Sequence, residues 1–188
     1  MASTPRILAF AGSARRESFN RKFLAVAVQA AREGGAEVTL IDLNDYVLPL
    51  YHGDLEDQSG MPENATKFVA LIAQHDALLI ASPEYNSMIT PLLKNTIDWC
   101  TRADDDPFPG KVAAVISASP GGFGAVRSLV MAQQLLLKLG CHIIPGQTAL
   151  PQASKVFDAE GKLTDARALK SVQGLVTSLI ATTKKLAG

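Results

Sequence analysis

Short apolar runs alternate with longer amphipathic stretches along this chain of 188 residues. The runs typical of strands cover residues 6–11, 37–42, 77–82, 111–117 and 141–147. Apolar positions at helical spacing occupy residues 20–33, 62–74, 91–102, 126–139 and 164–185. Gly34-Gly35 and Gly140 follow two of these stretches and suit helix ends. Because strands alternate with helices, the pattern predicts a parallel sheet with right-handed crossovers and helices on both faces.

The expected architecture is a flavodoxin-like, doubly wound α/β fold with five parallel strands in the order 2-1-3-4-5. In that order the loops after strands 1, 3 and 4 meet at one edge of the sheet, at its topological switch point. The chain has no repeat, linker or low-complexity tract, and its length and 47% hydrophobic content fit a single domain over residues 1–188.

The loop after the first predicted strand reads Gly-Ser-Ala-Arg-Arg-Glu-Ser-Phe-Asn over residues 12–20. The side chains of Ser13, Arg15, Ser18 and Asn20 can donate hydrogen bonds, and the next helix adds its free N–H groups. The segment lacks the dinucleotide fingerprint, the P-loop pattern and a phosphatase nucleophile. It therefore predicts a site that holds a phosphomonoester without cleaving it. An ordinary Gly/Ser turn with a capped helix is the alternative.

The loop after the third predicted strand, residues 82–91, is framed by Pro83 and Pro91. Such a rigid loop could place Tyr85 beside a flat ring, although a plain connecting turn also fits. The helix opened by Pro91 carries apolar residues on more than one face, which predicts contact with a second subunit; packing within one subunit is the alternative. These apolar residues are Leu92, Leu93, Ile97 and Trp99, whereas Lys94, Asn95 and Asp98 fit a solvated face.

The loop after the fourth predicted strand is rich in glycine. Gly121, Gly122 and Gly124 follow Ser119 and Pro120, which frees the backbone to bring its N–H groups against a ligand. Such donors suit the carbonyl edge of a heteroaromatic ring, whereas a turn without a ligand is the alternative. The convergence of three unusual loops at one predicted edge favours a binding site.

Charge and composition narrow the range of partners. The chain has 18 basic and 18 acidic residues, so its charge favours neither nucleic acid nor an anionic membrane. The first residues lack a signal-peptide hydrophobic region and no apolar run could span a bilayer, so we expect a cytoplasmic location. Cys100 and Cys141 read as reduced structural thiols. The acidic runs at 54–57 and 104–106 read as solvated turns, so no metal is expected.

Four motifs together resemble the NAD(P)H-dependent FMN reductase family, the flavodoxin-like group that includes quinone, chromate and azo-dye reductases. They are Gly-Ser-x-Arg-x-x-Ser-x-Asn at 12–20, Ser-Pro-Glu-Tyr-Asn at 82–86, Leu-Lys-Asn-x-Ile-Asp-Trp at 93–99 and Ser-Pro-Gly-Gly-x-Gly-x-x-Arg at 119–127. The resemblance runs from about Arg6 to the final helix. The last forty residues add little to it beyond Leu150-Pro151-Gln152-Ala153.

The resemblance implies FMN as cofactor and NADPH or NADH as hydride donor. The implied FMN-phosphate ligands are Ser13, Arg15, Ser18 and Asn20. The implied lining of the isoalloxazine comprises Pro83, Glu84, Tyr85 and Asn86, partly through backbone groups, with Ser119, Gly121 and Gly122 at its pyrimidine edge. Arg127 matches a family arginine that could serve either subunit contacts or the mouth of the site, and a plain surface charge is equally open.

The implied reaction is ping-pong reduction of a small acceptor such as a quinone, free flavin, an azo dye or chromate. Because the flavin carries the chemistry, no catalytic side chain is expected. The family also implies a homodimer or homotetramer. Two other classes stay open: an electron carrier of the flavodoxin type, which Arg15 and the zero net charge disfavour, and a flavin-free regulatory or scaffold module, which the three loops disfavour.

Overall fold

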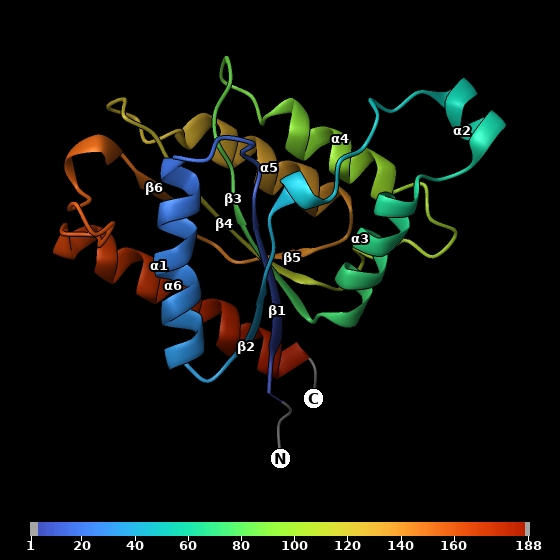
Figure 1. Cartoon of the computed structure of the whole chain (residues 1–188). Coiled ribbons are helices and arrows are strands. Elements are labelled where there is room, and N and C mark those ends of the chain that lie inside the picture. Colours follow the sequence, from blue (N-terminus) through green and yellow to red (C-terminus); the bar gives the residue numbers. More distant parts are fainter. Residues whose placement is uncertain (1–3, 187–188) are drawn as a thin grey trace.

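The computed structural model describes residues 4–186 and contains one sheet (Figure 1). Its strands pair in parallel in the order β2-β1-β3-β4-β5, and β6 also pairs with β4. The strands are β1 (Arg6–Ala11), β2 (Glu37–Leu40), β3 (Ala77–Ala81), β4 (Val112–Ala118), β5 (His142–Ile143) and β6 (Thr148–Leu150). The predicted fold class and strand order are confirmed.

Helices cover both faces of this sheet. They are α1 (Phe19–Glu33), α2 (Gly53–Ser59), α3 (Glu63–Gln74), α4 (Pro91–Cys100), α5 (Val126–Lys138) and α6 (Ala166–Leu186). Short 3-10 turns occupy Leu43–Asp45 and Ala153–Lys155. Each predicted helix is present within a few residues of its expected bounds, whereas α2 was not predicted.

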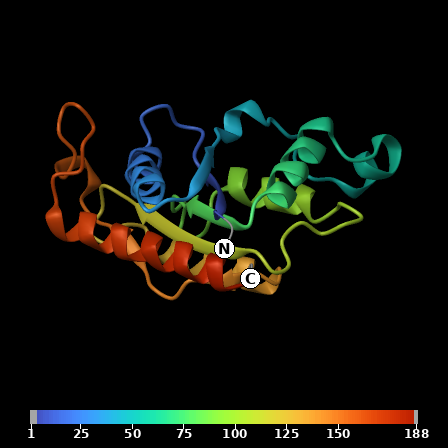
Figure 2. The same ribbon diagram turned by 90° about the horizontal axis from the view of Figure 1, so that it is seen from below.

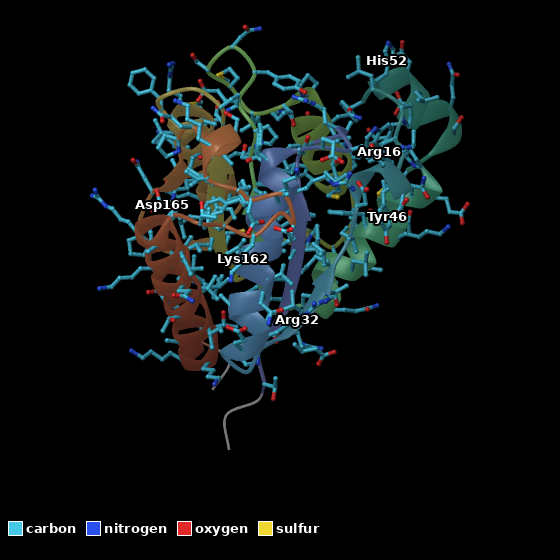
Figure 3. All side chains as sticks on the ribbon, turned by 60° about the vertical axis from the view of Figure 1, so that its left-hand side comes forward. Arg16, Arg32, Tyr46, His52, Lys162 and Asp165 are labelled. Atoms are coloured by element: carbon cyan, nitrogen blue, oxygen red, sulfur yellow. The ribbon has the colours of Figure 1, made fainter. Side chains whose placement is uncertain are left out.

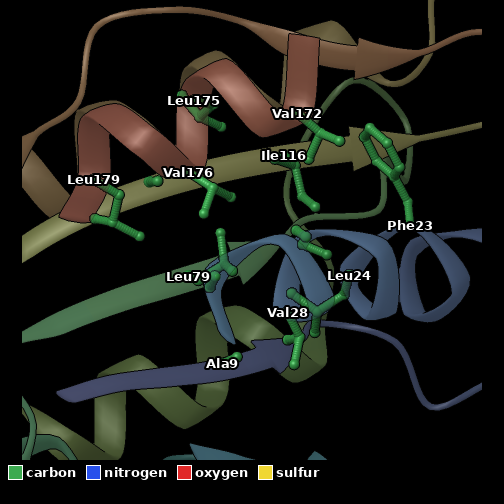
Figure 4. Packing of buried hydrophobic residues seen from close by; sticks show 14 of the residues in the cluster. Ala9, Phe23, Leu24, Val28, Leu79, Ile116, Val172, Leu175, Val176 and Leu179 are labelled. Atoms are coloured by element: carbon green, nitrogen blue, oxygen red, sulfur yellow. The ribbon is translucent and has the colours of Figure 1, made fainter. Parts of the chain in front are cut away.

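Alternation along the strands divides the core into two layers. Every second residue of β1, β3 and β4 faces α1 and α6. The residues between them face α3, α4 and α5 on the other side of the sheet. Helices α1 and α6 lie side by side (Figures 1 and 2). Figure 4 shows Val172 and Val176 of α6 pointing toward Ile116 and Leu79 of the sheet. β3 and β4 are buried throughout, which accounts for their continuous apolar runs in the sequence.

The fifth predicted strand, residues 141–147, is wrong in its extent. Only His142 and Ile143 pair with the first half of β4, and the chain then leaves the sheet until Thr148 rejoins the second half. Pro145 lacks the N–H that a ladder needs, and Gly146 has a φ of 125°, so the backbone turns away between the two short strands.

A long arm, residues 46–62, connects the 3-10 turn after β2 to α3 and carries α2 at its outer end (Figure 1). The arm is fastened to α4. The indole N–H of Trp99 donates to the carbonyl oxygen of Pro49 over 2.8 Å, and Asn95 Nδ2 donates to the same oxygen over 2.9 Å. Asn95 Oδ1 accepts from the N–H of Tyr51 at 2.8 Å. Asn95 is therefore a tertiary contact and not part of a solvated face.

The arm also explains the apolar residues of α4. Leu93, Ile97 and Trp99 are buried within this chain, the last beneath the arm. At the outer end, Arg102 Nε donates to Glu56 Oε1 over 2.8 Å, and this hydrogen bond lowers the pKa of Glu56. The expectation that these apolar residues reach a second subunit therefore does not hold for Leu93, Ile97 and Trp99.

Candidate functional site

The loops after β1, β3 and β4 meet around one cavity of about 120 Å³ at the carboxyl edge of the sheet. All of the residues predicted to form the site line it except Asn86, Gly121 and Gly122. The lining residues are Ser13, Arg15, Ser18, Phe19, Asn20, Pro83, Glu84, Tyr85, Ala118, Ser119 and Pro120. Residues far apart in the sequence are thus brought together where doubly wound folds bind ligands.

The protein has larger cavities elsewhere. This cavity is distinguished by the chemistry of its lining residues and not by its volume. A cavity of about 410 Å³ lies beside β2 and includes Arg21, Leu40, Asp42 and Tyr46. Arg21 and Asp42 form an ion pair with each other there. The charges of these two side chains therefore neutralise each other. The smaller cavity instead combines hydroxyl groups, a cationic side chain and a helix N-terminus that can face a ligand.

The first loop begins with a close backbone contact to its neighbours. The N–H of Gly12 donates to the carbonyl oxygen of Ala81 at 2.9 Å, and Thr90 Oγ1 donates to that of Gly12 at 2.6 Å. A Cβ on Gly12 would lie 2.8 Å from Leu93 Cβ. Only glycine therefore lets α4 pack directly against the start of the loop, which fixes the loop relative to β3.

Two buried hydroxyl groups and a helix start face the cavity. Ser13 Oγ accepts from the N–H of Arg15 at 3.3 Å, and Ser18 Oγ caps α1 by accepting from the N–H of Arg21 at 3.5 Å. Each hydroxyl keeps its own hydrogen for donation. The first N–H groups of α1 are free of helical partners and carry the positive end of its dipole. Together with the exposed Arg15 side chain, this arrangement fits the phosphate of FMN.

Two side chains from outside the cavity bind carbonyl groups of this loop, and no sequence motif indicates these contacts. Arg21 Nη1 donates to the carbonyl oxygen of Arg15 at 3.4 Å, and Asn44 Nδ2 donates to that of Ala14 at 3.3 Å. Asn44 follows β2, thirty positions away from Ala14. These two side chains support the loop from outside the cavity.

Asn20 reaches the cavity but uses its amide to join two elements. Nδ2 donates to the carbonyl oxygen of Ala118 at 2.8 Å, and Oδ1 accepts from the N–H of Ala118 at 3.0 Å. One amide hydrogen is left for a ligand. Asn20 therefore fastens the start of α1 to the end of β4.

The loop after β3 forms a tight hairpin at its tip. Tyr85 and Met88 exchange backbone hydrogen bonds of 3.0 Å, and the two residues between them, Asn86 and Ser87, have φ angles of 52° and 68°. Positive φ at both central positions is the geometry of a type I′ turn. Asn86 sits at this turn and does not line the cavity, whereas Tyr85 does, with half of its surface exposed.

The glycine-rich turn after β4 is held by side chains and by the segment after β6. Gly121 donates its N–H to Ser119 Oγ at 3.1 Å, and Ser117 Oγ donates to the carbonyl oxygen of Gly124 at 2.8 Å. Gly124 has a φ of 61°, and a Cβ there would lie 2.8 Å from the backbone of Leu150 and Pro151. Gly121 and Gly122 are exposed at the outer part of the turn, outside the lining of the cavity.

Thiol chemistry at the site is excluded by the position of the cysteines. Cys100 and Cys141 are buried, and burial raises the pKa of each thiol to about 12. Within residues 4–186 no three His, Cys, Asp or Glu side chains gather in a way that could hold a metal ion. No helix in the same range is long and apolar enough to cross a membrane.

The fold and the three loops define a flavodoxin-like flavoprotein whose candidate site lies at the switch point of the sheet. The chain belongs to the NADPH-dependent FMN reductase family, whose sequence profile matches residues 5–155. It is 34% identical over 189 residues to an NAD(P)H-dependent FMN reductase of Pseudomonas aeruginosa, with 100% of both chains covered. It is 36% identical over 188 residues to an NADPH:quinone oxidoreductase of Arabidopsis thaliana, covering 97% of this chain and 94% of the relative.

Solved structures agree with this assignment. The flavoenzyme FerB of Paracoccus denitrificans, an NAD(P)H:acceptor oxidoreductase, superimposes with a TM-score of 0.83 at 30% identity. The match covers 97% of this chain and 98% of FerB. The protein is therefore an NAD(P)H-dependent oxidoreductase that uses FMN, as its sequence motifs imply.

Proposed function

We propose that this enzyme uses the cavity between the three loops to bind FMN and reduces small acceptors such as quinones, free flavin, azo dyes or chromate. The observation that carries the proposal is the meeting of buried hydroxyl groups, an arginine and the start of α1 at the carboxyl edge of the sheet. The residues proposed to hold FMN are Ser13, Arg15, Ser18, Asn20, Pro83, Glu84, Tyr85, Asn86, Ser119, Gly121 and Gly122.

FMN, when bound, supplies the chemistry: it accepts hydride from the nicotinamide and passes electrons to the acceptor. The role of the protein is to bind FMN and to orient it. Ser13, Ser18 and Arg15 hold the phosphate, and the Tyr85 hairpin forms one wall for the ring. Ser119 and the glycine-rich turn would lie at the pyrimidine edge, where hydrogen-bond donors would stabilise negative charge. No side chain has to act as an acid or a base.

The kinetic consequence is a ping-pong mechanism, because donor and acceptor use the same open face in turn. Initial rates with NADH or NADPH at several fixed quinone concentrations should give parallel double-reciprocal lines. Intersecting lines would show that donor and acceptor bind together and would contradict the shared pocket. FMN-loaded protein that turns over neither nicotinamide would instead be an electron carrier, and protein that takes up no FMN would be a regulatory or scaffold module.

The proposal includes a homodimer or homotetramer in which α4 and α5 form the contact. An apolar groove of about 480 Å³ runs between them, lined by Met88, Ile89, Pro91, Met131 and Leu135, with Lys94, Gln134 and Lys138 at its rim. Because Met88 belongs to the Tyr85 hairpin, a second copy seated in this groove lies next to the site.

Substitution of Leu135 by Glu should lower the sedimentation coefficient at micromolar concentration. Leu137→Glu is the matched control, since Leu137 is on the same helix, is 63% exposed and does not line the groove. A parent chain that sediments at 19.9 kDa with full FMN occupancy and full turnover would contradict the oligomer.

We place the enzyme in the cytoplasm as part of this proposal. The thiols of Cys100 and Cys141 are free, which is typical of proteins kept in a reducing compartment. Fractionation of cells with activity measured in each fraction tests the location, and activity recovered outside the cytoplasmic fraction would contradict it.

A further inference from the structure

Glu84 lies between two of the loops that form the site and joins them. Its Oε2 accepts from the N–H groups of Arg127 and Ser128, at 3.1 and 3.2 Å. Its Oε1 lies 3.6 Å from Arg127 Nη1, and the Glu84 side chain is only 17% exposed. The hydroxyl of Ser128 donates in turn to the carbonyl oxygen of Ser82 at 3.1 Å. The loop after β3 and the start of α5 are therefore one bonded unit.

The start of α5 needs this outside partner because its own cap supplies none. The cap residue is Ala125, in the left-handed conformation, and its methyl group cannot accept a hydrogen bond. The first N–H groups of a helix have no helical acceptors and carry its positive end. Glu84, more than forty positions earlier in the chain, provides both the acceptor and the opposite charge.

Glu84 differs from the other acidic residues of the protein in that it lines the cavity. Of the described residues that line it, Glu84 carries the only negative charge, and Arg15 carries the only positive one. Arg127 lies just outside the cavity lining, with its guanidinium group 5.3 Å from the ring centroid of Phe123. The removal of Glu84 or of Arg127 thus changes the local charge by one unit in opposite directions.

We propose that Glu84 is a positioning residue that holds the start of α5 and the glycine-rich turn in place, and that its charge sets how strongly the site prefers oxidised over reduced FMN. The proposal rests on FMN binding in this cavity, as stated above. Reduced FMN gathers negative charge at its pyrimidine edge, which the proposed orientation places by the glycine-rich turn. A neighbouring carboxylate disfavours that charge, and a neighbouring guanidinium group favours it.

The size of the effect follows from Coulomb's law. One unit of charge within about 10 Å changes a binding constant about tenfold when the effective dielectric constant is about 20. For a two-electron couple, a tenfold change in the ratio of the two affinities equals a shift of about 30 mV in midpoint potential. The ratio of the reduced and oxidised affinities can therefore be read from one equilibrium measurement of the midpoint potential.

The test compares three variants of the FMN-loaded protein by equilibration with a reference dye. Glu84→Gln keeps an acceptor for the helix N–H groups but loses the charge, so the midpoint potential should rise by about 30 mV. Arg127→Gln removes the positive charge, so the potential should fall. Asp165→Asn is the matched control, because Asp165 Oδ1 accepts from the N–H groups of Arg167 and Ala168 at the start of α6, at 2.9 and 3.0 Å.

The control probes the same kind of helix cap outside the site. Asp165 does not line the cavity, and Figure 3 shows it across the molecule from Arg16 of the first loop. Asp165→Asn should leave the potential unchanged while lowering the thermal unfolding temperature about as much as Glu84→Gln does. Fluorescence titration of each apo protein with FMN gives the oxidised affinity independently.

Two results would overturn the proposal. One is an unchanged potential in Glu84→Gln, and the other is a shift of the same sign in Glu84→Gln and Arg127→Gln, which a loosened fold alone would produce. Either result with a parent chain that binds FMN and turns over NAD(P)H leaves the proposed function standing. A parent chain that binds no FMN would overturn both.

Discussion

Asn20 and Ala118, ninety-eight positions apart in the chain, exchange two hydrogen bonds in which one side-chain amide satisfies both backbone groups of a residue at the end of β4. The contact is buried, and it joins the start of α1 to the strand that precedes the glycine-rich turn. The cavity between these two segments therefore depends on a structural amide as well as on the groups that face a ligand.

Asn20→Ala should destabilise the apo protein. The substitution leaves the buried N–H and C=O groups of Ala118 without their partner, which costs about 2 to 4 kcal/mol. Urea denaturation without FMN measures the change in the free energy of unfolding. Asn64→Ala is the control, because Asn64 makes a single exposed bond to the carbonyl oxygen of Val47 and its loss should cost less than about 1 kcal/mol. Equal losses of stability in the two variants would contradict the structural role of Asn20.

Arg15→Ala should weaken FMN binding without unfolding the chain. A charge-assisted contact of arginine with phosphate contributes roughly 1.5 to 3 kcal/mol, so the dissociation constant should rise about ten- to a hundredfold. Titration of apo protein with FMN measures it. Arg32→Ala, at the other end of α1, is the matched control (Figure 3), because the Arg32 side chain donates to the carbonyl oxygen of Val38, away from the cavity. Equal affinities for Arg15→Ala and the parent would remove Arg15 from the site.

Gly124→Ala should cost several times more stability than Gly35→Ala. Both glycines have positive φ, 61° and 82°, so alanine strains the backbone by about 1 kcal/mol at either position. Only at Gly124 would the new methyl group also lie 2.8 Å from the backbone of Leu150 and Pro151. Thermal unfolding of the two variants separates the clash from the shared strain. Similar unfolding temperatures would mean that the β6 segment can move aside freely.

Cys100 and Cys141 should resist Ellman's reagent at pH 8 in the native protein and react fully after unfolding. Burial raises the pKa of each thiol to about 12, above the value near 9 of the unfolded chain. The stability that goes with a raised pKa is present below pH 9 and is lost as the pH rises toward 12. Labelling of native protein as fast as that of unfolded protein would show that the core opens. Single Cys→Ala variants assign each thiol.

Local sequence signals accounted for the positions of β1 to β4 and for most of the cavity lining, whereas the strand order came from the expected fold class. The buried runs of β3 and β4 and the glycines that end helices are readable because burial and turn geometry restrict the residues at those positions. Ser13, Ser18 and Tyr85 likewise lie on loops whose composition marks them. The site residues themselves stay predictions until a ligand is titrated.

The partners that hold these loops could not be read from the sequence. Asn44 supports the loop after β1, Glu84 caps α5, and Asn95 fastens the arm, each across a long separation in the chain. Such pairings arise only when the fold brings two segments together, and no spacing rule connects them. The division of the last strand into β5 and β6 was missed because an apolar run conceals one proline and one glycine that interrupt pairing.

Trp99, the single tryptophan of the chain, lies beneath the arm with its indole bonded to Pro49. Its emission is therefore a natural optical probe of one local event, the docking of the arm on α4. Release of the arm would let water reach the indole and shift its fluorescence to longer wavelength while the sheet stays folded. Fluorescence and far-ultraviolet circular dichroism followed together thus distinguish a partly opened enzyme from an unfolded one, without any added label.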